Sequence, residues 1–394
     1  MAGVPALPAG LLDRVTALAE TLAPLAADVD AGAGDGTASL KLLKDAGLLR
    51  SLVPRDAGGD GLSFAQYTRV LEVIGARDVA TALALNMHNV SIGALREAAA
   101  GRLGATGRAF ADWVFREITE HDRMFASATS EAGTGAKLRG VRTTYRRSEG
   151  TYVLGGRKSF VSLAGVADYY VVAARDAAED AENEVSHFVV SATDEGVTFG
   201  TPWTGQALAG THTADMTLDG VRLGRERLFL GVEGMSLFKL VREPHWMVSG
   251  YTGAYLGLAV ALVRELTACV RDSPARAASP VTVRELGRLS ARLAAARALT
   301  YTACAEVDAA RGTPRANTAV HAAKYAVAEL LTELVASAPR LAGTTALDRR
   351  RALHRYLREA PFCSVMPAKP DECLDYVGKS ALGVDLADAR AFDW

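Results

Sequence analysis

Residues 155–172, GGRKSFVSLAGVADYYVV, carry the clearest structural signal in the chain. Apolar and aromatic residues alternate there with a period of two, and glycine and aspartate interrupt the run, a pattern that predicts β-strands. Phe160 and Ser162 lie two positions apart, which places an aromatic ring and a hydroxyl on the same side of one strand. Such a pair could border the ring and the edge of a flat ligand, although a lone phenylalanine is more often a core residue.

On either side of this β-pattern, apolar residues recur at intervals of three and four, which predicts helices. Helical periodicity covers the chain up to about residue 120 and returns after Glu233. This order is that of an α+β fold. We therefore predict an N-terminal helical domain (1–121), a central β-domain (122–231) and a C-terminal helical domain (232–394). Long helical segments are expected in the last domain at about 235–272, 280–312, 315–342 and 348–360.

Composition excludes several classes of partner. Forty-four Lys and Arg against 45 Asp and Glu leave a net charge of −1, so no overall field attracts nucleic acid or an anionic membrane. The four cysteines and seven histidines show no ligand spacing, and we expect no metal. The least polar stretch, 246–263, contains hydroxyls and three glycines, so a buried core helix is expected there and not a membrane span. The first residues lack the pattern of a secretory signal, and a cytoplasmic location is expected.

Five segments of the chain resemble, in order and spacing, the acyl-CoA dehydrogenase flavoprotein superfamily. By itself ATSEAGTGA is a Gly-rich turn in which the backbone can come close to a planar polar ligand. The resemblance is carried by the whole set and extends over almost the entire chain. The segments are VPRDAGGDGLSFAQYTRVLEVIGARD (53–78), ATSEAGTGA (128–136), the stretch 155–172, TADMTLDGVRLGRERLFLG (213–231) and YTGAYLGLAVALV (251–263).

This resemblance implies an architecture and a cofactor. The central domain would be a β-barrel, the C-terminal domain a four-helix bundle, and FAD would lie between them. A neighbouring subunit of a homodimer or homotetramer would close the flavin site. Carried over residue by residue, Thr129 and Ser130 would hydrogen-bond the pyrimidine side of the flavin. Phe160 would stand where the family usually has Trp, and Ser162 would lie near the reactive N5.

The sequence departs from the family at the catalytic base. Dehydrogenases of this family remove the α-proton of an acyl thioester with a glutamate, while flavin N5 accepts the β-hydride. In most members that glutamate lies eight residues beyond the Asp of an Arg-Asp pair. Arg358 and Glu359 resemble this pair, and the corresponding position in this sequence is Pro367. In a second group it would align with Met247. Neither position is acidic.

Other family signatures are reduced. The segment that reaches a neighbour's FAD is represented by Arg271 alone, and the glycine pair near the end of the bundle by Ala342 and Gly343. Pro339 replaces the glutamine before that pair, and Ala136 replaces a phosphate-side serine. Arg271 and Gly343 are therefore the remaining candidates for cofactor contacts in this part of the chain.

Nearby residues are candidates for a relocated base. Glu243 lies one helical turn before Met247, and His245 lies two residues before Met247. Asp371 or Glu372 could fold back from a proline-bounded loop. A solvated charge or a helix cap is the alternative interpretation for each, and we take Glu243 and His245 as the catalytic candidates.

Three functional hypotheses follow from the resemblance. The first is FAD-dependent α,β-desaturation of an acyl thioester, carried on CoA or on an acyl carrier protein, with an electron-transfer flavoprotein as a possible acceptor. The second is a two-component monooxygenase on the same fold, supplied by a flavin reductase, because members of that branch also lack the glutamate. The third is a catalytically degenerate subunit that completes the site of a paralogue. A redox-neutral use of the α-carbanion fits the same pocket, and the Ala-, Arg- and Gly-rich composition would suit secondary metabolism.

Overall fold

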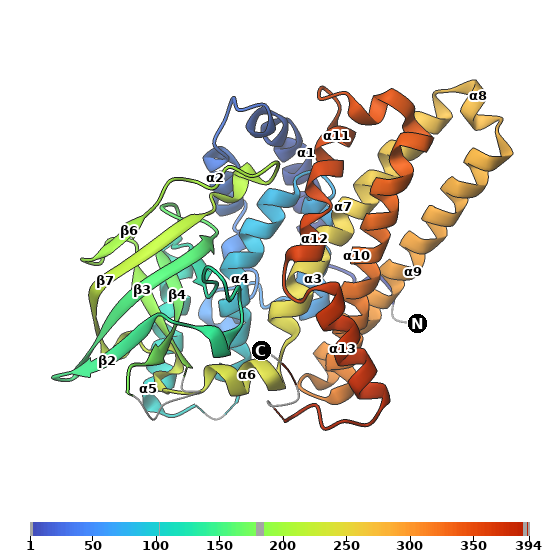
Figure 1. Ribbon diagram of the computed structural model, residues 1–394. Coiled ribbons are helices and arrows are strands. Elements are labelled where there is room, and N and C mark those ends of the chain that lie inside the picture. The colour runs from blue at the N-terminus through green and yellow to red at the C-terminus, as the bar shows by residue number, and fades with distance from the viewer. Residues whose placement is uncertain (1–2, 102, 179–184, 389–391, 393–394) are drawn as a thin grey trace.

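Helices form the first part of the chain in the computed structural model, which describes residues 3–101, 103–178, 185–388 and 392 (Figure 1). Local sequence determines where two of them begin. Ser63 caps α3 through a capping box with Gln66, and Asp78 accepts a hydrogen bond from the Thr81 N–H at the start of α4. The predicted helical N-terminal part is confirmed. Its elements are α1 Leu11–Asp30, α2 Thr37–Asp45, 3₁₀ helices Leu48–Arg50 and Arg55–Ala57, α3 Phe64–Gly75, α4 Val79–Ala99 and α5 Ala105–His121.

The middle of the chain forms one seven-stranded sheet. β3 pairs antiparallel with β2 and β7, and β7 pairs with the short β6. β4 runs parallel to β1 and β2 and antiparallel to β5. The predicted β-domain is confirmed, but the sheet is a half-barrel and not a complete barrel, since no described pairing joins β5 to β6. The strands are β1 Phe125–Ala128, β2 Thr144–Ser148, β3 Thr151–Val161, β4 Tyr169–Asp176, β5 Val185–Ser191, β6 Val197–Phe199 and β7 Ala214–Gly224.

A β-bulge interrupts β3 close to its end. Lys158 pairs with Met216 and Val161 with Ala214, so β3 has one residue more than β7 between these two pairs. Phe160 lies in the bulge with a φ of 54°. The extra residue breaks the alternation of the strand, so the Lys158 side chain is buried while Phe160 is 60% exposed. Ser162 follows the last residue of β3, so the simple strand face predicted for Phe160 and Ser162 is replaced by a bulge and a turn.

Eight helices make up the described C-terminal part. Pro244 interrupts the segment predicted at 235–272, so that it becomes α6 and α7. Helices α7, α9 and α13 each pack against α10, and α7 also packs against α9. The four-helix bundle as such stays a prediction. The segment predicted at 348–360 is shorter than expected and forms α11, which packs against α7 and α1. The helices are α6 Ser236–Arg242, α7 His245–Arg271, α8 Pro274–Ala277, α9 Pro280–Ala310, α10 Pro314–Ala342, α11 Ala352–Glu359, α12 Phe362–Val365 and α13 Pro370–Ala381.

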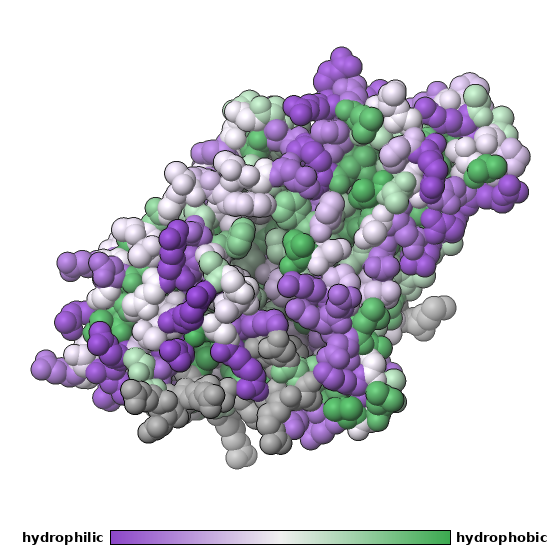
Figure 2. Space-filling view, in the orientation of Figure 1, coloured by the Kyte–Doolittle hydropathy of each residue, from purple (hydrophilic) through white to green (hydrophobic). Residues whose placement is uncertain are grey.

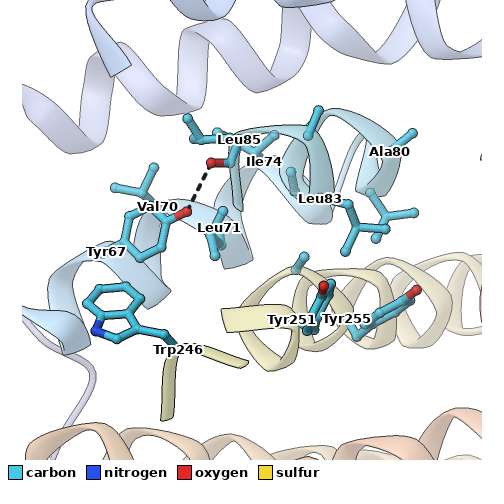
Figure 3. Packing of buried hydrophobic residues seen from close by; sticks show 14 of the residues in the cluster. Tyr67, Val70, Leu71, Ile74, Ala80, Leu83, Leu85, Trp246, Tyr251 and Tyr255 are labelled. Carbon is cyan, nitrogen blue, oxygen red and sulfur yellow. Dashed lines mark hydrogen bonds between the residues drawn. The ribbon is translucent and has the colours of Figure 1, made fainter. Parts of the chain in front are cut away.

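Helix α7 is the central element of the helical core. Its glycines permit close packing, because a Cβ at Gly257 would lie 2.3 Å from the carbonyl oxygen of Glu72 on α3. Trp246 of α7 lies beside Tyr67 of α3, whose hydroxyl donates to the Leu85 carbonyl of α4 at 3.3 Å (Figure 3). Among the described residues, α7 is the one helix long and apolar enough to cross a membrane, and 67% of its most apolar window is buried. A buried core helix was predicted for this stretch.

Helix α4 connects the two halves of the fold. It packs against α7 on one side and against β1 on the other, and Figure 1 shows it standing between the sheet and the bundle. α5 ends at His121 and β1 begins at Phe125, while α6 begins at Ser236. The domain limits at 121/122 and 231/232 stay predictions.

Candidate functional site

A row of three aromatic rings crosses from the sheet to the C-terminal helices. The Phe160 ring lies 5.7 Å from that of Trp203, which in turn lies 5.9 Å from that of Phe362 on α12. Phe160 is 60% exposed and Trp203 43% exposed, so two large apolar surfaces face solvent. Figure 2 shows this side of the molecule hollowed where the sheet meets the C-terminal helices. The sequence indicated Phe160 alone, since Trp203 and Phe362 come from a distant loop and from α12, and neither segment carries a motif.

Three hydroxyl groups lie next to this aromatic row in sequence and in space. Ser162 Oγ is 3.3 Å from Thr213 Oγ1, which is 2.9 Å from Thr211 Oγ1. The turn after β3 is attached to the segment before β7, because the Leu163 N–H donates to the Thr211 carbonyl at 2.8 Å. Ser162 was predicted from the sequence. The two threonines were missed, although they belong to the hydroxyl-rich run THT at 211–213.

The loop that holds Thr129 and Ser130 rests on a buried ion pair. The Ser159 N–H donates to the Ser130 carbonyl at 2.8 Å. Lys158 Nζ lies 2.8 Å from Glu131 Oε1 and donates to the Thr129 carbonyl at 3.3 Å. Burial lowers the pKa of Lys158 to about 8, although Glu131 favours its charged form. The 129–130 backbone is thereby fixed, with both predicted side chains half-buried at the end of β1.

These residues fit a flat aromatic cofactor. An exposed phenylalanine and tryptophan lose contact with water when a ring packs on them, and aromatic pairs gain further from offset or edge contacts. Two buried polar atoms in the same loops, Thr134 Oγ1 and His212 Nε2, have no hydrogen-bond partner within the described residues. Donors and acceptors are thus available beside an aromatic wall, as a flavin requires.

Arg271 and Gly343 lie at the end of the bundle that carries α8. Arg271 is exposed at the last turn of α7 and pairs with Asp272 at 3.2 Å. Gly343 follows α10 with a φ of 63°, and a Cβ there would lie 2.7 Å from a guanidinium nitrogen of Arg276 on α8. The structure places both residues at this end of the bundle, and their contact with a neighbour's cofactor stays a prediction.

A buried lysine organises the loop that contains Pro367. Lys324 of α10 is fully buried, and its ammonium donates to the carbonyls of Cys363, Ala368 and Met366 at 2.6, 3.1 and 3.5 Å. Burial of an ammonium is tolerable when acceptors surround it. The backbone of 363–368 is therefore held by its carbonyls. The sequence offered no signal for this role.

Glu243 is engaged by cations. It follows α6, and its carboxylate lies 3.2 Å from Lys239 and 3.8 Å from Arg311. Glu372, one of the two further acids named from the sequence, accepts from the Lys369 N–H at 2.8 Å at the start of α13, as a helix cap does. No described hydrogen bond or ring contact joins Glu243 to Phe160 or Ser162.

His245 forms a buried pair with Glu97 of α4. Its Nε2 lies 3.0 Å from Glu97 Oε1, and its Nδ1 is buried without a partner among the described residues. Burial raises the pKa of Glu97, but the hydrogen bond from His245 and the charge of Arg311 bring it below its ordinary value. Because a carboxylate only accepts, neutral His245 carries its hydrogen on Nε2 and leaves a lone pair on Nδ1.

Unpaired polar atoms gather where α4 faces α7. We call this set the α4–α7 polar cluster. All of its side chains are buried, and each has an atom without a described hydrogen-bond partner. The helices are in contact here, since a Cβ at Gly250 would lie 2.6 Å from Asn86 Oδ1. The atoms are Asn86 Nδ2, Asn89 Oδ1, His245 Nδ1, Ser249 Oγ and Tyr255 Oη.

Tyr255 is fully buried, and its hydroxyl is one of the atoms of the polar cluster. Burial raises the pKa of Tyr255, and the charges of Cys363, Tyr251 and Glu359 add to the shift. Phe362, the last ring of the aromatic row, is the neighbour of Cys363. Buried polar groups without partners are uncommon in folded proteins and need an explanation, such as an ordered water or a ligand.

Comparisons with known proteins agree with this geometry. Profiles of acyl-CoA dehydrogenase match residues 11–100 (N-terminal domain), 126–221 (middle domain) and 250–366 (C-terminal domain). The chain is 24% identical over 360 residues to a putative acyl-CoA dehydrogenase, YdbM, of Bacillus subtilis, covering 88% of this chain and 90% of that protein. It is 28% identical over 351 residues to the amino sugar nitrososynthase DnmZ of Streptomyces peucetius, covering 86% and 85%.

A solved structure shares the fold over nearly its full length. KijD3, in complex with FMN and dTDP-3-amino-2,3,6-trideoxy-4-keto-3-methyl-D-glucose, superposes with a TM-score of 0.86 at 24% identity, covering 98% of this chain and 97% of that one. The homologues are consistent with an oxidoreductase of the class that acts on CH–CH bonds. With three successive domain profiles matched in order, the chain belongs to the acyl-CoA dehydrogenase family and is a flavin oxidoreductase of that kind.

Proposed function

We propose that this chain is a flavin-dependent monooxygenase that acts on a polar substrate bearing hydroxyl or amine groups. The observation that carries the proposal is the α4–α7 polar cluster, a set of buried donors and acceptors without described partners. The 28% identity to an amino sugar nitrososynthase supports it. A fatty acyl chain in this place would leave each of these polar groups unpaired, at a cost of about 1–3 kcal/mol apiece.

Different residues would hold the flavin and the substrate. Phe160 and Trp203 would cover the flavin ring and exclude water, while Ser162 and the 129–130 backbone would hold its polar edge. A bound reduced flavin, supplied by a reductase, would provide two electrons so that one atom of O₂ enters the substrate and the other leaves as water. The polar cluster would bind and orient the substrate.

His245 would manage the proton of the substrate group that is oxidised. Its Nε2–H is held by Glu97, so Nδ1 is the atom that can take a proton from an amine or hydroxyl. Glu97 would stabilise the resulting imidazolium. Of the two catalytic candidates from the sequence, we retain His245. Glu243 stays a prediction, and its ion pairs with Lys239 and Arg311 argue against a role as the base.

The same histidine favours a second candidate function. A buried His–Glu pair with a free Nδ1 is a possible relocated base for α,β-desaturation of an acyl-CoA or an acyl-carrier-protein thioester. FAD as the flavin, an electron-transfer flavoprotein or a flavin reductase as the electron partner, and a homodimer or homotetramer as the assembly all remain proposals carried by the family resemblance.

One experiment separates the two functions. The protein is reconstituted with FAD, and in parallel with FMN, and mixed with either an amino-sugar nucleotide or an acyl-CoA panel. Under ¹⁸O₂ with a flavin reductase, a monooxygenase incorporates one labelled oxygen into the amino sugar. Bleaching of the oxidised flavin by an acyl thioester without oxygen, together with no label in any polar substrate, would establish desaturation and reject our proposal.

A matched pair of variants tests the polar cluster itself. Ser249→Ala removes one unpaired hydroxyl from the cluster, and Ser337→Ala removes a buried hydroxyl of α10 that bonds Glu285 at 2.7 Å, away from the cluster. We expect the first to weaken binding of the polar substrate by about fivefold or more and the second to leave it unchanged. Equal effects of the two variants on substrate binding would show that the cluster does not contact substrate.

A further inference from the structure

An arginine-lined pocket lies further along α7 than the polar cluster, beginning about one and a half turns beyond Tyr255. It has a volume of about 260 Å³ and is formed where α1, α3, α7 and α9 meet. We call it the arginine pocket. Its lining is Leu12, Thr16, Ala19, Glu20, Arg69, Glu72, Val73, Ala76, Arg77, Val260, Arg264 and Arg297. None of these residues belongs to the aromatic row, the flavin loops or the polar cluster.

The charges around this pocket do not balance. Four guanidinium groups and two carboxylates line it, which leaves two positive charges in excess. Arg264 has one further acid at 3.2 Å, Glu265, but that carboxylate is outside the lining. Even with Glu265 included, one positive charge remains.

The two lining carboxylates are already occupied. Glu72 is almost fully buried, lies 2.6 Å from an Arg69 nitrogen and 2.8 Å from Arg297 Nε, and also accepts from the Tyr301 hydroxyl. Glu20 accepts from Arg77 at 2.5 Å. Neither acid is therefore free to neutralise the remaining charge.

Several arginine donors remain available. A guanidinium has five N–H donors, and those of Arg264 make only long contacts, 3.5 Å to the Ala76 carbonyl and 3.2–3.3 Å to Glu265. Arg297 Nε is buried beside Glu72 but has no aligned hydrogen bond among the described residues. A planar acceptor with two oxygens matches the fork of such a group.

Apart from Thr16, the rest of the pocket wall is apolar. Leu12, Val73, Ala76 and Val260 supply carbon surface beside the arginines. Pockets for drug-sized ligands have volumes of about 300–1,000 Å³. The volume of the arginine pocket, about 260 Å³, therefore suits a smaller ligand. We propose that the arginine pocket binds a small organic anion, with its carboxylate or phosphate on Arg264 and Arg297 and a short apolar body against Val73 and Val260.

This site is independent of the proposed monooxygenase reaction. It joins the N-terminal helices α1 and α3 to the bundle helices α7 and α9, so a bound anion would stabilise their junction. A ligand that binds only the folded state raises its stability by mass action. We therefore expect a rise in the melting temperature, on the order of a few degrees at saturation, with or without a substrate for the flavin site.

The test uses the full-length holoprotein and three probes of equal apolar size. Butyrate and propyl phosphate carry the two anionic groups on a propyl body, and butyramide is the uncharged comparison. Calorimetric titration and thermal unfolding at constant ionic strength should detect one or both anions and not butyramide. The anion that binds more tightly shows whether the pocket prefers a carboxylate or a phosphate. Equal responses to butyramide and to the anions would overturn the proposal.

Two arginine variants locate the binding. Arg264→Gln removes a donor whose ion pair with Glu265 is half-buried and lies at the pocket rather than in the core, so folding should be retained, and we expect at least tenfold weaker anion binding. The matched control is Arg288→Gln on α9, which pairs with Glu285 and Glu333 outside the pocket and should leave binding unchanged. Anion binding that Arg264→Gln does not weaken would place the anion elsewhere and refute the assignment.

Discussion

The Lys158–Glu131 ion pair gives the sharpest test of how the flavin loop is held. Lys158→Met keeps most of the side-chain volume but leaves Glu131, whose side chain is 4% exposed, with only the exposed Arg142 guanidinium at 3.9 Å as a counter-charge. Removing one partner of a buried ion pair costs about 3–5 kcal/mol. Glu131 keeps hydrogen bonds from Thr143 Oγ1 at 2.7 Å and from the N–H groups of Arg142 and Thr143 at 2.8 and 3.0 Å. We therefore expect the lower end of that range, about 3 kcal/mol.

The assay is urea denaturation of the wild type, both single variants and the double variant. Lys158→Met combined with Glu131→Gln removes both charges, so it should be less destabilised than the sum of the single variants by at least about 1.5 kcal/mol. Lys41→Met is the control, because Lys41 forms an exposed pair with Asp45 and should cost less than about 0.5 kcal/mol. A Lys158→Met cost no larger than that of the control, or strictly additive costs, would refute the reasoning.

Three further predictions use other parts of the fold. Burial raises the pKa of Glu359 to about 8, above its unfolded value, so the unfolded state loses that proton first and the free energy of unfolding falls as the pH rises from about 5 to 8. Glu359→Gln should flatten this fall in denaturation curves measured at pH 5 and pH 8.5, and an unchanged pH profile would contradict it. Lys324→Met should cost about 3–5 kcal/mol and open 363–368 to limited proteolysis, because three carbonyls lose their donor; protection equal to wild type would argue against the clamp. Phe160→Ala should weaken flavin binding by about two- to tenfold in fluorescence titration, and an unchanged Kd would remove Phe160 from the flavin wall.

The order of the three parts of the fold was predictable because it depends on local periodicity. The change from a period of 3.6 to a period of two near residue 122 can be read from neighbouring residues, and so can the caps at Ser63 and Asp78. The Phe160 bulge was not predictable, since it results from the pairing of β3 with β7, some 55 residues later. That α13 packs against α10, whereas the 348–360 segment packs against α7 and α1, depends on long-range packing in the same way.

The candidate site was predictable only where residues are close in sequence. Phe160, Ser162, Thr129 and Ser130 came from two short segments. Trp203 and Phe362 belong to the same row of rings but lie more than 40 and more than 200 residues after Phe160, respectively. No sequence pattern connects their segments to Phe160. Paired charges such as His245–Glu97 are invisible in a sequence because each partner looks like an ordinary surface residue.

The three hydrogen bonds from Lys324 to the loop of residues 363–368, which we call the Lys324 clamp, have a consequence for how this loop can change over evolution. Its three acceptors are backbone carbonyls, which every amino acid supplies. The hydrogen bonds from Lys324 therefore do not depend on which side chains residues 363–368 carry, and substitutions at the exposed and half-buried positions can alter chemistry without removing these bonds. A position such as 367 is free to exchange an acid for a proline while the loop remains in place. The Lys324 clamp thus allows the side chains of this loop to differ between relatives while these hydrogen bonds are kept.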